Sequence, residues 1–301
     1  MLFQNKWEPS LNYKSLSLDH ILKIGSTEND YLKNITQFFI SELKKCDFSC
    51  IEKVIGIESQ EDQLSILLEA VRDGQIDTFC YPLDQSPIFE QNESLCISAI
   101  SKRIHCGEGV VFQSKSHHPS SVHELQKGWK LAVFSERQCV QLTSLFPDST
   151  FTLHPINEKT DIFEIFFEGI DGVVLSSLDY HLISQNNDQL LSYIPIHPSE
   201  LIPAPGHGVI AYICHKEDFV TRTILNKIHN REMVPIVNNE RMVMEASANE
   251  FHNKIGVYCY EDTRNNFHIH GFFTDTLSKF RFSQNIVQGL GLKLMSSLLP
   301  K

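Results

Sequence analysis

The sequence predicts an α/β protein with a largely parallel sheet, and two observations carry this prediction. Short apolar runs, typical of buried strands, alternate with longer stretches whose apolar residues recur every three or four positions, as in helices. Turn signals such as Asp73-Gly74 separate these segments. Repeated alternation of strand and helix favours βαβ connections over an all-helical or all-β fold.

The first strand is expected over 21–25, and the Gly25-Ser26-Thr27 turn then leads into a helix over 31–45. A second helix over 64–72 ends at Asp73-Gly74, because glycine commonly terminates helices. Ser135 is a good N-cap residue and should begin a helix that runs to Phe146. By the same patterns, further helices are expected over 161–167, 219–228, 240–248 and 285–299, and strands over 76–81, 95–100, 110–112, 130–134, 151–153, 172–175, 209–214, 255–260 and 268–273. We detect no internal repeat, and the polar stretch 113–126 is the best candidate for an interdomain linker.

Composition argues against several classes of partner. The chain has 301 residues and a formal net charge of −11, which makes nucleic acids and anionic membranes poor partners. No apolar run reaches the roughly 18 residues of a membrane span. Residues 1–17 lack the apolar core of a secretory signal.

The cysteines predict a reducing environment. None of the eight forms a CxxC pair, and several lie inside apolar runs, as Cys80 does. Free buried thiols explain this pattern better than a disulfide framework. We therefore expect a cytoplasmic protein, and we expect it to be a monomer.

Several segments, in the same order along the chain, resemble the hydroxymethylbilane synthase (porphobilinogen deaminase) family from about Ile21 to Leu299. The most specific is Leu201–Gly208, LIPAPGHG, which is similar to the family's LPAVGQG turn. The other matches are Leu22–Ser26 to an LRIGTR-like strand, Asp73–Asp77 to a GRAD turn, Glu136–Gln138 to an SLRR helix start, Ile170–Leu175 to YDAIVLA, and Glu240-Arg241 with Lys254–Tyr258 to ERAFL…PIGVYA.

The resemblance implies three domains: two periplasmic-binding-protein-like lobes with an active site between them, and a small C-terminal α/β domain. The corresponding ranges here are 18–115 with 201–217 for the first lobe, 116–200 for the second and 218–301 for the third domain. In the family, a cysteine of the third domain attaches a dipyrromethane cofactor that primes the joining of four porphobilinogen units.

The cofactor-anchoring and catalytic positions both differ from the family. Counting without a gap from Glu240-Arg241 places Phe251 at the anchoring cysteine, and phenylalanine cannot form a thioether. Cys259 falls inside a predicted strand and is expected in the core. Gln85 stands at the catalytic aspartate and Asp84 at the adjacent lysine, although a one-residue slip would make Asp84 the carboxylate. We therefore expect no covalent dipyrromethane, and no metal.

The cluster of basic residues that binds substrate carboxylates in the family is also largely replaced. Arg137 retains one of two paired arginines, and Gln138 replaces the other. Ser135 could present N–H groups to an anion, although a helix cap alone explains it. The remaining cleft candidates are Thr27 at an arginine position, Asp161 (with Pro155) in the segment that supplies two more arginines, and His207 in the family's turn. Losing several charge-assisted hydrogen bonds, at about 1.5–3 kcal/mol each, would weaken polycarboxylate binding by powers of ten.

Two interpretations remain. In the first, the chain is a bilobal ligand-binding or interaction module without deaminase activity, whose small-molecule or protein partner the sequence does not identify. In the alternative, it is a divergent active porphobilinogen deaminase that works with Asp84 and makes hydroxymethylbilane. Elsewhere, His268 and His270 alternate on a strand and therefore share one face, where they could form half a metal site or a pH-sensitive patch.

Overall fold

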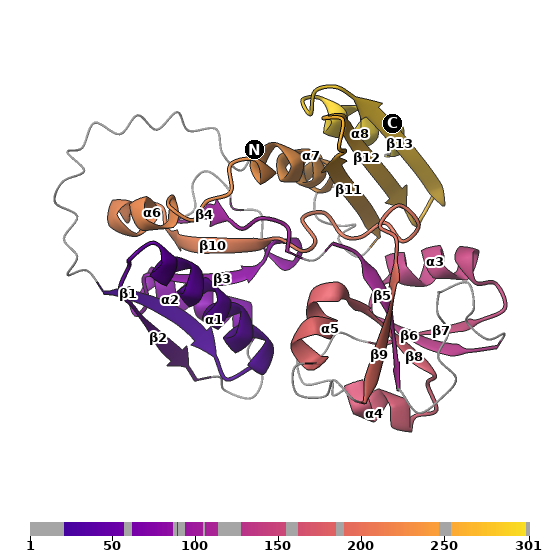
Figure 1. The fold of residues 1–301 in the computed structure, drawn as a ribbon, viewed down its shortest axis with the longest axis horizontal. Helices are drawn as coiled ribbons and strands as arrows, with labels where there is room; N and C mark the ends of the chain where they lie inside the picture. Colours follow the sequence, from indigo (N-terminus) through magenta and orange to yellow (C-terminus); the bar gives the residue numbers. More distant parts are fainter. Residues whose placement is uncertain are drawn as a thin grey trace. The chain divides into compact units, whose positions relative to one another are not determined.

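The computed structural model describes residues 21–56, 62–86, 89, 94–104, 106–113, 128–154, 162–184, 190–246 and 254–298. These residues separate into two compact units, one drawn from 1–103 and 209–234 and the other from 104–208 and 235–301 (Figure 1). The chain therefore leaves the first unit and returns to it, and each unit is built from discontinuous segments.

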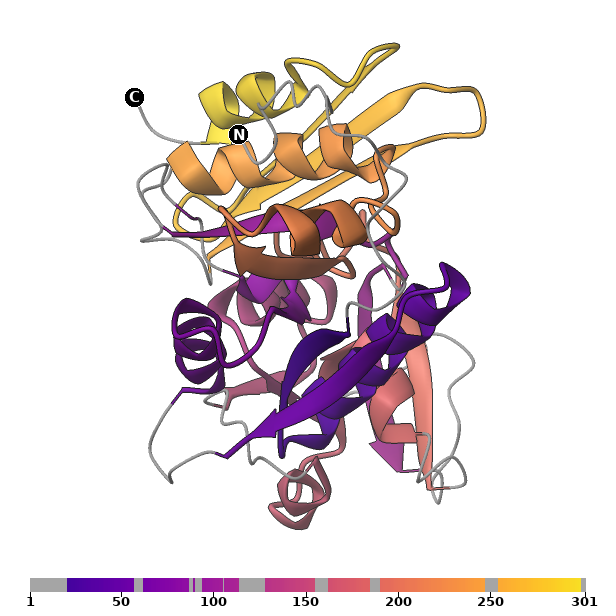
Figure 2. The ribbon, with the colours of Figure 1, turned by 90° about the vertical axis from the view of Figure 1, so that its left-hand side faces the viewer.

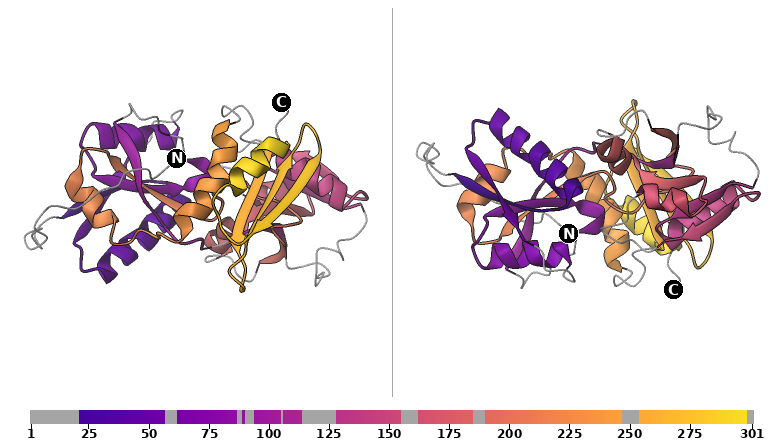
Figure 3. Two further views of the ribbon diagram at one scale, coloured as in Figure 1. Left: turned by 90° about the horizontal axis from the view of Figure 1, so that it is seen from above. Right: turned by 90° about the horizontal axis from the view of Figure 1, so that it is seen from below.

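The first unit, here called lobe 1, is a five-stranded sheet with helices on both faces. The strand order is β2-β1-β3-β10-β4, and β10 runs antiparallel to both of its neighbours. Helices α1 and α2 lie on opposite faces (Figure 3). The elements are β1 (Leu22–Thr27), α1 (Asp30–Lys45), β2 (Cys50–Ile55), α2 (Gln63–Arg72), β3 (Thr78–Pro82), a 3₁₀ turn (Leu83–Gln85), β4 (Leu95–Ile100), β10 (Ile210–His215) and α6 (Phe219–Leu225).

The core of lobe 1 follows from its central strands, whose side chains are buried on both faces of the sheet. Every residue of β3 is buried, and the ring of Tyr212 of β10 packs against that of Phe39 of α1, with the ring centroids 4.5 Å apart. On the opposite face, Gly25 lets α2 approach closely. A Cβ added at Gly25 would lie 2.2 Å from Cδ1 of Ile76 and 3.2 Å from Cδ2 of Leu67.

Within the second unit, lobe 2 is another five-stranded sheet, with the order β7-β6-β8-β5-β9. Here β5 runs antiparallel to both neighbours. Both sheets thus share one strand order. In each sheet, four strands that follow one another along the chain are arranged in the order second, first, third and fourth. One strand from another part of the chain, β10 in lobe 1 and β5 in lobe 2, lies between the third and the fourth. The elements are β5 (Glu108–Gln113), β6 (Lys130–Val133), α3 (Glu136–Leu145), β7 (Thr150–Leu153), α4 (Ile162–Phe167), β8 (Gly172–Ser176), α5 (Ser177–Ser184) and β9 (Leu191–Ile196).

The rest of the second unit is an antiparallel sheet of order β11-β12-β13 with α7 and α8 beside it (Figure 2). Its other face packs on lobe 2, because Tyr258 and Phe272 form one buried cluster with Ile202. The elements are α7 (Met233–Ala246), β11 (Ile255–Glu261), β12 (Phe267–Phe273), β13 (Ser278–Gln284) and α8 (Leu290–Leu298).

The α/β fold class with two similar lobes and a small C-terminal α/β part is confirmed, with some differences. The sheets are mixed or antiparallel rather than largely parallel. Strand β5 lies in the sheet of lobe 2, whereas the expected boundary at residue 115 assigned it to lobe 1. Helix α7 begins at Met233, seven residues before the expected start, because Pro235 fits the first turn of a helix. The division into three domains stays a prediction, and the proposed linker lies almost entirely outside the described residues.

Candidate functional site

In lobe 1, the candidate residues lie at one edge of the sheet. Thr27 ends β1, and Asp84 and Gln85 directly follow β3. Strands β1 and β3 are parallel and pair at Gly25 and Phe79, so their carboxyl ends meet at the same edge. Ligands of open α/β sheets commonly bind at this edge.

Thr27 serves the structure of this edge rather than facing solvent. Its side chain is fully buried, and Oγ1 donates a hydrogen bond of 2.8 Å to Oε1 of Gln63 on α2. The same Oγ1 accepts a 3.4 Å bond from the backbone N–H of Asn29, which caps α1. The hydroxyl therefore joins β1 to the starts of two helices.

The turn after β3 presents two different side chains. Leu83 is fully buried and anchors the turn, Asp84 is half-buried and Gln85 is exposed. Gln85, which we expect at the position of the family's catalytic aspartate, is thus an exposed amide. An amide cannot take up a proton or supply a negative charge as a carboxylate does.

In lobe 2, the candidate residues gather at the start of α3. Ser135 is the N-cap, and its hydroxyl accepts a 3.1 Å bond from the backbone N–H of Gln138. Oε1 of Gln138 returns the interaction by accepting from the N–H groups of Phe134 and Ser135, at 2.8 and 3.1 Å. This reciprocal capping box confirms the predicted cap.

Arg137 is committed to a buried ion pair with Glu108, the first residue of β5. Its Nη1 and Nη2 donate to the two carboxylate oxygens at 2.9 and 2.7 Å, and Nη1 also donates to the carbonyl of Ile202 at 2.7 Å. Each charged side chain is 4% exposed. Arg137, which we expect at one of the family's paired arginine positions, therefore has its charge paired in the interior of the second unit.

The surroundings keep Glu108 ionised. Burial would raise the pKa of this carboxyl, but the guanidinium of Arg137, assisted by His207 and Gln138, lowers it below its ordinary value. Nε2 of Gln138 donates to Oε1 of Glu108 at 2.8 Å. His207 is 7% exposed, and its Nε2 lies 3.3 Å from the carbonyl oxygen of Gly107.

Sequence reasoning missed Glu108 as the centre of this network. A signal was present, because Glu108 precedes the apolar run Gly109–Phe112, and a carboxylate in a buried strand needs a partner. Glu240 is a second example. It is fully buried and accepts bonds from the N–H groups of Gly206 and Cys259, at 2.8 and 2.7 Å.

The remaining candidates are not brought into either group. Phe251, Pro155 and Asp161 lie outside the described residues. Cys259 is 1% exposed inside β11, where it was expected in the core.

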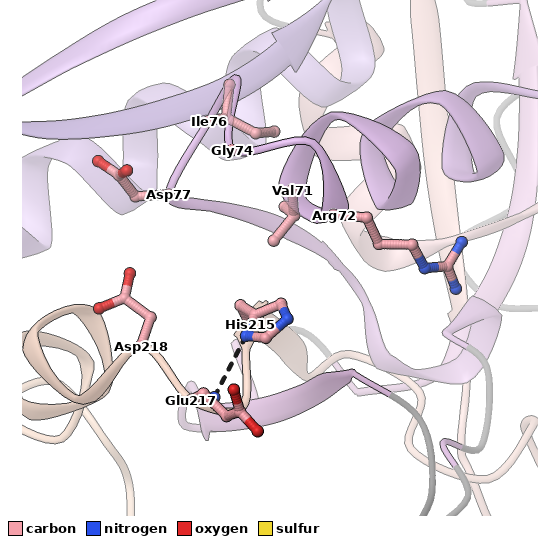
Figure 4. A pocket seen from close by; sticks show the side chains of 8 residues that line it. All are labelled: Val71, Arg72, Gly74, Ile76, Asp77, His215, Glu217 and Asp218. Carbon is pink, nitrogen blue, oxygen red and sulfur yellow. Dashed lines mark hydrogen bonds between the residues drawn. The ribbon is translucent and has the colours of Figure 1, made fainter.

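A pocket of about 340 Å³ lies elsewhere in lobe 1, at the edge where β3 begins and β10 ends (Figure 4). It contains none of the predicted residues. The Asp77 carboxylate on its wall accepts from the backbone N–H of Lys23 at 2.7 Å. Asp218 caps α6 through Thr221, so two of the pocket's carboxylates already have structural partners.

The described residues contain no group of three or more histidine, cysteine, aspartate or glutamate residues placed to hold a metal ion. Among the same residues, no helix is long and apolar enough to cross a membrane.

Comparison with solved structures gives partial matches at low sequence identity. The periplasmic VFT2 domain of BvgS from Bordetella pertussis matches with a TM-score of 0.41 and 16% identity, over 73% of this chain and 93% of that one. The L-cystine solute receptor of Neisseria gonorrhoeae matches with a TM-score of 0.40 and 14% identity, over 73% and 91%.

Sequence comparison identifies the family. The family model described as "Porphobilinogen deaminase, dipyromethane cofactor binding domain" matches residues 50–223, more than half of the chain. The porphobilinogen deaminase of Caldicellulosiruptor saccharolyticus is 33% identical over 208 residues, which are 69% of this chain and 67% of the relative. The chain belongs to the porphobilinogen deaminase family.

Coverage of the relatives is partial. The porphobilinogen deaminase of Limosilactobacillus reuteri (strain DSM 20016) is 29% identical over 210 residues. That alignment spans 69% of this chain and 64% of the relative, so this chain matches somewhat less than two thirds of the relative's length.

The expectation that no dipyrromethane cofactor is involved is corrected by this comparison. The matching family domain is a dipyrromethane cofactor-binding domain, which points to that cofactor rather than to none. The expectation rested on residue 251 alone, which lies beyond the matched range. The buried thiol of Cys259 does not fit as the attachment point, because a thioether there would force a dipyrrole into the packed interior around β11.

Proposed function

We propose that this protein uses the porphobilinogen deaminase fold as a bilobal ligand-binding or interaction module and does not convert porphobilinogen to hydroxymethylbilane. The observation that carries the proposal is the buried ion pair of Arg137 with Glu108. A guanidinium that is 4% exposed, and whose Nη atoms donate to both oxygens of Glu108 and to a carbonyl, is not accessible to a substrate carboxylate in solution.

The end of β3 supports the same proposal. Stabilising a cationic intermediate requires a fixed negative charge, and removing one such preorganised group typically costs about 10²–10³ in rate. In the favoured register, Gln85 supplies an exposed amide at this position. Asp84 is the nearest carboxylate in sequence, and the active alternative depends on it.

The first ligand to test is a dipyrromethane, because the matching family domain binds that cofactor. In this proposal, the protein holds a linear pyrrole without extending it. We also propose that it acts as a cytoplasmic monomer, since its thiols are free and its net charge of −11 disfavours nucleic acid and anionic membranes.

The deciding experiment is a turnover assay of the full chain with porphobilinogen, beside a known active deaminase and an Asp84→Asn variant. We expect no uroporphyrin above the enzyme-free control. Turnover that disappears in the Asp84→Asn variant would overturn the proposal and establish the active alternative.

Intact mass spectrometry gives a readout that does not depend on turnover. Protein purified from a host that makes haem is weighed under native and denaturing conditions. A bound dipyrromethane in a protein without turnover supports a role in holding a linear pyrrole. If the protein shows neither a bound dipyrromethane nor turnover, the result supports a role as an interaction module.

A further inference from the structure

Two cysteines face each other on neighbouring strands of lobe 1. Cys96 lies on β4 and Cys214 on β10, and the antiparallel register pairs them directly. Directly opposed residues point to the same face, with Cβ atoms about 4.5–5.5 Å apart. A disulfide requires a Cβ separation of about 3.5–4.5 Å, so a small approach of the two strands would allow the bond.

The two thiols differ in their surroundings. Cys214 is fully buried, whereas Cys96 is half-buried. The hydrogen bond with Cys214 lowers the pKa of Cys96 against the effect of burial, and the positive charges of Arg222 and Lys216 lower it further. The same hydrogen bond and burial raise the pKa of Cys214.

Arg222 lies on helix α6, and Lys216 lies between β10 and that helix. Nη1 of Arg222 donates a 2.8 Å hydrogen bond to the carbonyl of Lys216, which directly follows β10. Helix α6 packs against both strands. Because thiolates are the reactive form of cysteine, the half-buried Cys96 beside two cations is the first of the pair to react.

We propose that Cys96 and Cys214 form a reversible redox pair, which a hydroperoxide such as hydrogen peroxide converts to a disulfide. The Cys96 thiolate attacks one peroxide oxygen, the O–O bond breaks, and the leaving hydroxide takes up a proton to become water. The sulfenic acid on Cys96 is then attacked by the Cys214 sulfur, which loses its proton as a second water departs. Overall, the two thiols lose two protons and two electrons, and the peroxide becomes two molecules of water.

The position of the pair gives the bond a structural effect. The chain leaves lobe 1 after β4 and returns to it as β10, so the bridge would link the strands on either side of that excursion. A bond that needs the strands to approach is expected to be strained and therefore readily reduced, as regulatory disulfides are. The oxidised form should resist unfolding of lobe 1 more than the reduced form.

The test treats the reduced full chain with limiting hydrogen peroxide, blocks remaining thiols by alkylation and maps the peptides by mass spectrometry. We expect a cross-linked pair of Cys96 and Cys214 peptides, about 2 Da lighter than the two thiol forms together, which dithiothreitol separates. The exposed Cys46 serves as an internal control, and the bridge should form at least about tenfold faster than Cys46 is oxidised.

Two variants assign the roles. In Cys96→Ser, Cys214 should remain reduced, because it is buried and is not the thiol that attacks the peroxide. In Cys214→Ser, Cys96 should accumulate as sulfenic or sulfinic acid. Full oxidation of Cys46 in the wild-type protein while Cys96 and Cys214 stay reduced would overturn the proposal, as would bridging of either residue to another cysteine.

Discussion

At the scale of single residues, Arg137 is a buried cation that donates hydrogen bonds to Glu108 and to the carbonyl of Ile202 in the protein interior. A charge that is 4% exposed is stable only if paired, and Glu108 supplies both oxygens. Sequence reasoning identified Arg137 from its resemblance to a family position but could not predict its partner. Glu108 lies 29 residues earlier, on a strand whose pairing depends on the whole sheet.

Breaking this pair from one side should be costly. Arg137→Met leaves a buried, unpaired carboxylate, so we expect the free energy of unfolding to fall by about 3–5 kcal/mol. The double variant Arg137→Met with Glu108→Leu removes both charges and should lose less than the sum of the single changes. Urea unfolding of the wild type, both single variants and the double variant measures the coupling. Strict additivity would show that the pair does not hold lobe 2 together.

A second residue-scale prediction concerns His270. It is 7% exposed, packed near Tyr260, and its Nε2 has no hydrogen-bond partner. Burial, followed by the nearby Arg281, His268 and His197, lowers its pKa from 6.5 to about 4. Between these values the unfolded chain binds more protons than the folded one, so stability contributed by neutral His270 is complete above pH 6.5 and is lost as pH falls toward 4.

The free energy of unfolding should therefore fall less between about pH 6.5 and 4 when His270 is replaced by glutamine. The difference from the wild type should be on the order of 1–2 kcal/mol. Urea unfolding at several pH values measures the change, and the exposed His181→Gln is the matched control. A slope that His270→Gln leaves unaltered would assign the acid sensitivity to other groups. The sequence placed His268 and His270 on one face, and the structure bears this out through their stacking with Tyr260.

At the scale of elements, the strands that sequence patterns failed to predict are all edge strands. Strands β2, β9 and β13 each form the edge of a sheet. Edge strands are partly solvated and carry polar residues, as in Ser278–Gln284, or proline, as Pro195 in β9. Their apolar signal is therefore weak. Strand β4 (Leu95–Ile100) is also an edge strand, but its sequence is largely apolar and it was predicted to the residue.

Close packing of β11 against lobe 2 gives an element-scale prediction. A Cβ added at Gly256 would lie 2.5 Å from the carbonyl oxygen of Ile202 and 3.2 Å from Cδ of Arg137. Gly256→Ala should therefore separate β11 from lobe 2 and lower the free energy of unfolding by about 1–3 kcal/mol. The control is Gly56→Ala, because nothing lies within 4 Å of its added Cβ. Thermal unfolding of both variants checks this, and equal stability would mean that β11 yields without cost.

At the scale of the whole molecule, the two lobes share one strand order although the sequence shows no repeat. Local patterns predicted most helices and strands because periodicity and turn residues are local signals. They could not predict that β10 lies between β3 and β4, since that pairing joins residues more than 100 positions apart. For the same reason, the family resemblance located Gln85 and Arg137 but not the partners that determine what these residues can do.

The central place of β10 predicts how the molecule responds to truncation. Each residue of β10 from Ile210 to Cys214 is at most 1% exposed, and the strand pairs with both β3 and β4. A chain ending after Gly208 lacks this strand, which leaves β4 without a partner and exposes the edge of β3. We expect hydrogen exchange in β1, β3 and β4 to approach that of the unfolded chain. A chain ending after Val234 retains β10 and α6, and it should keep these strands protected. Both truncations remove the three-stranded C-terminal sheet equally, so the two chains differ only by the returning segment that carries β10 and α6. Equal protection in the two chains would show that lobe 1 folds without its returning strand, contrary to the buried position of that strand in the sheet.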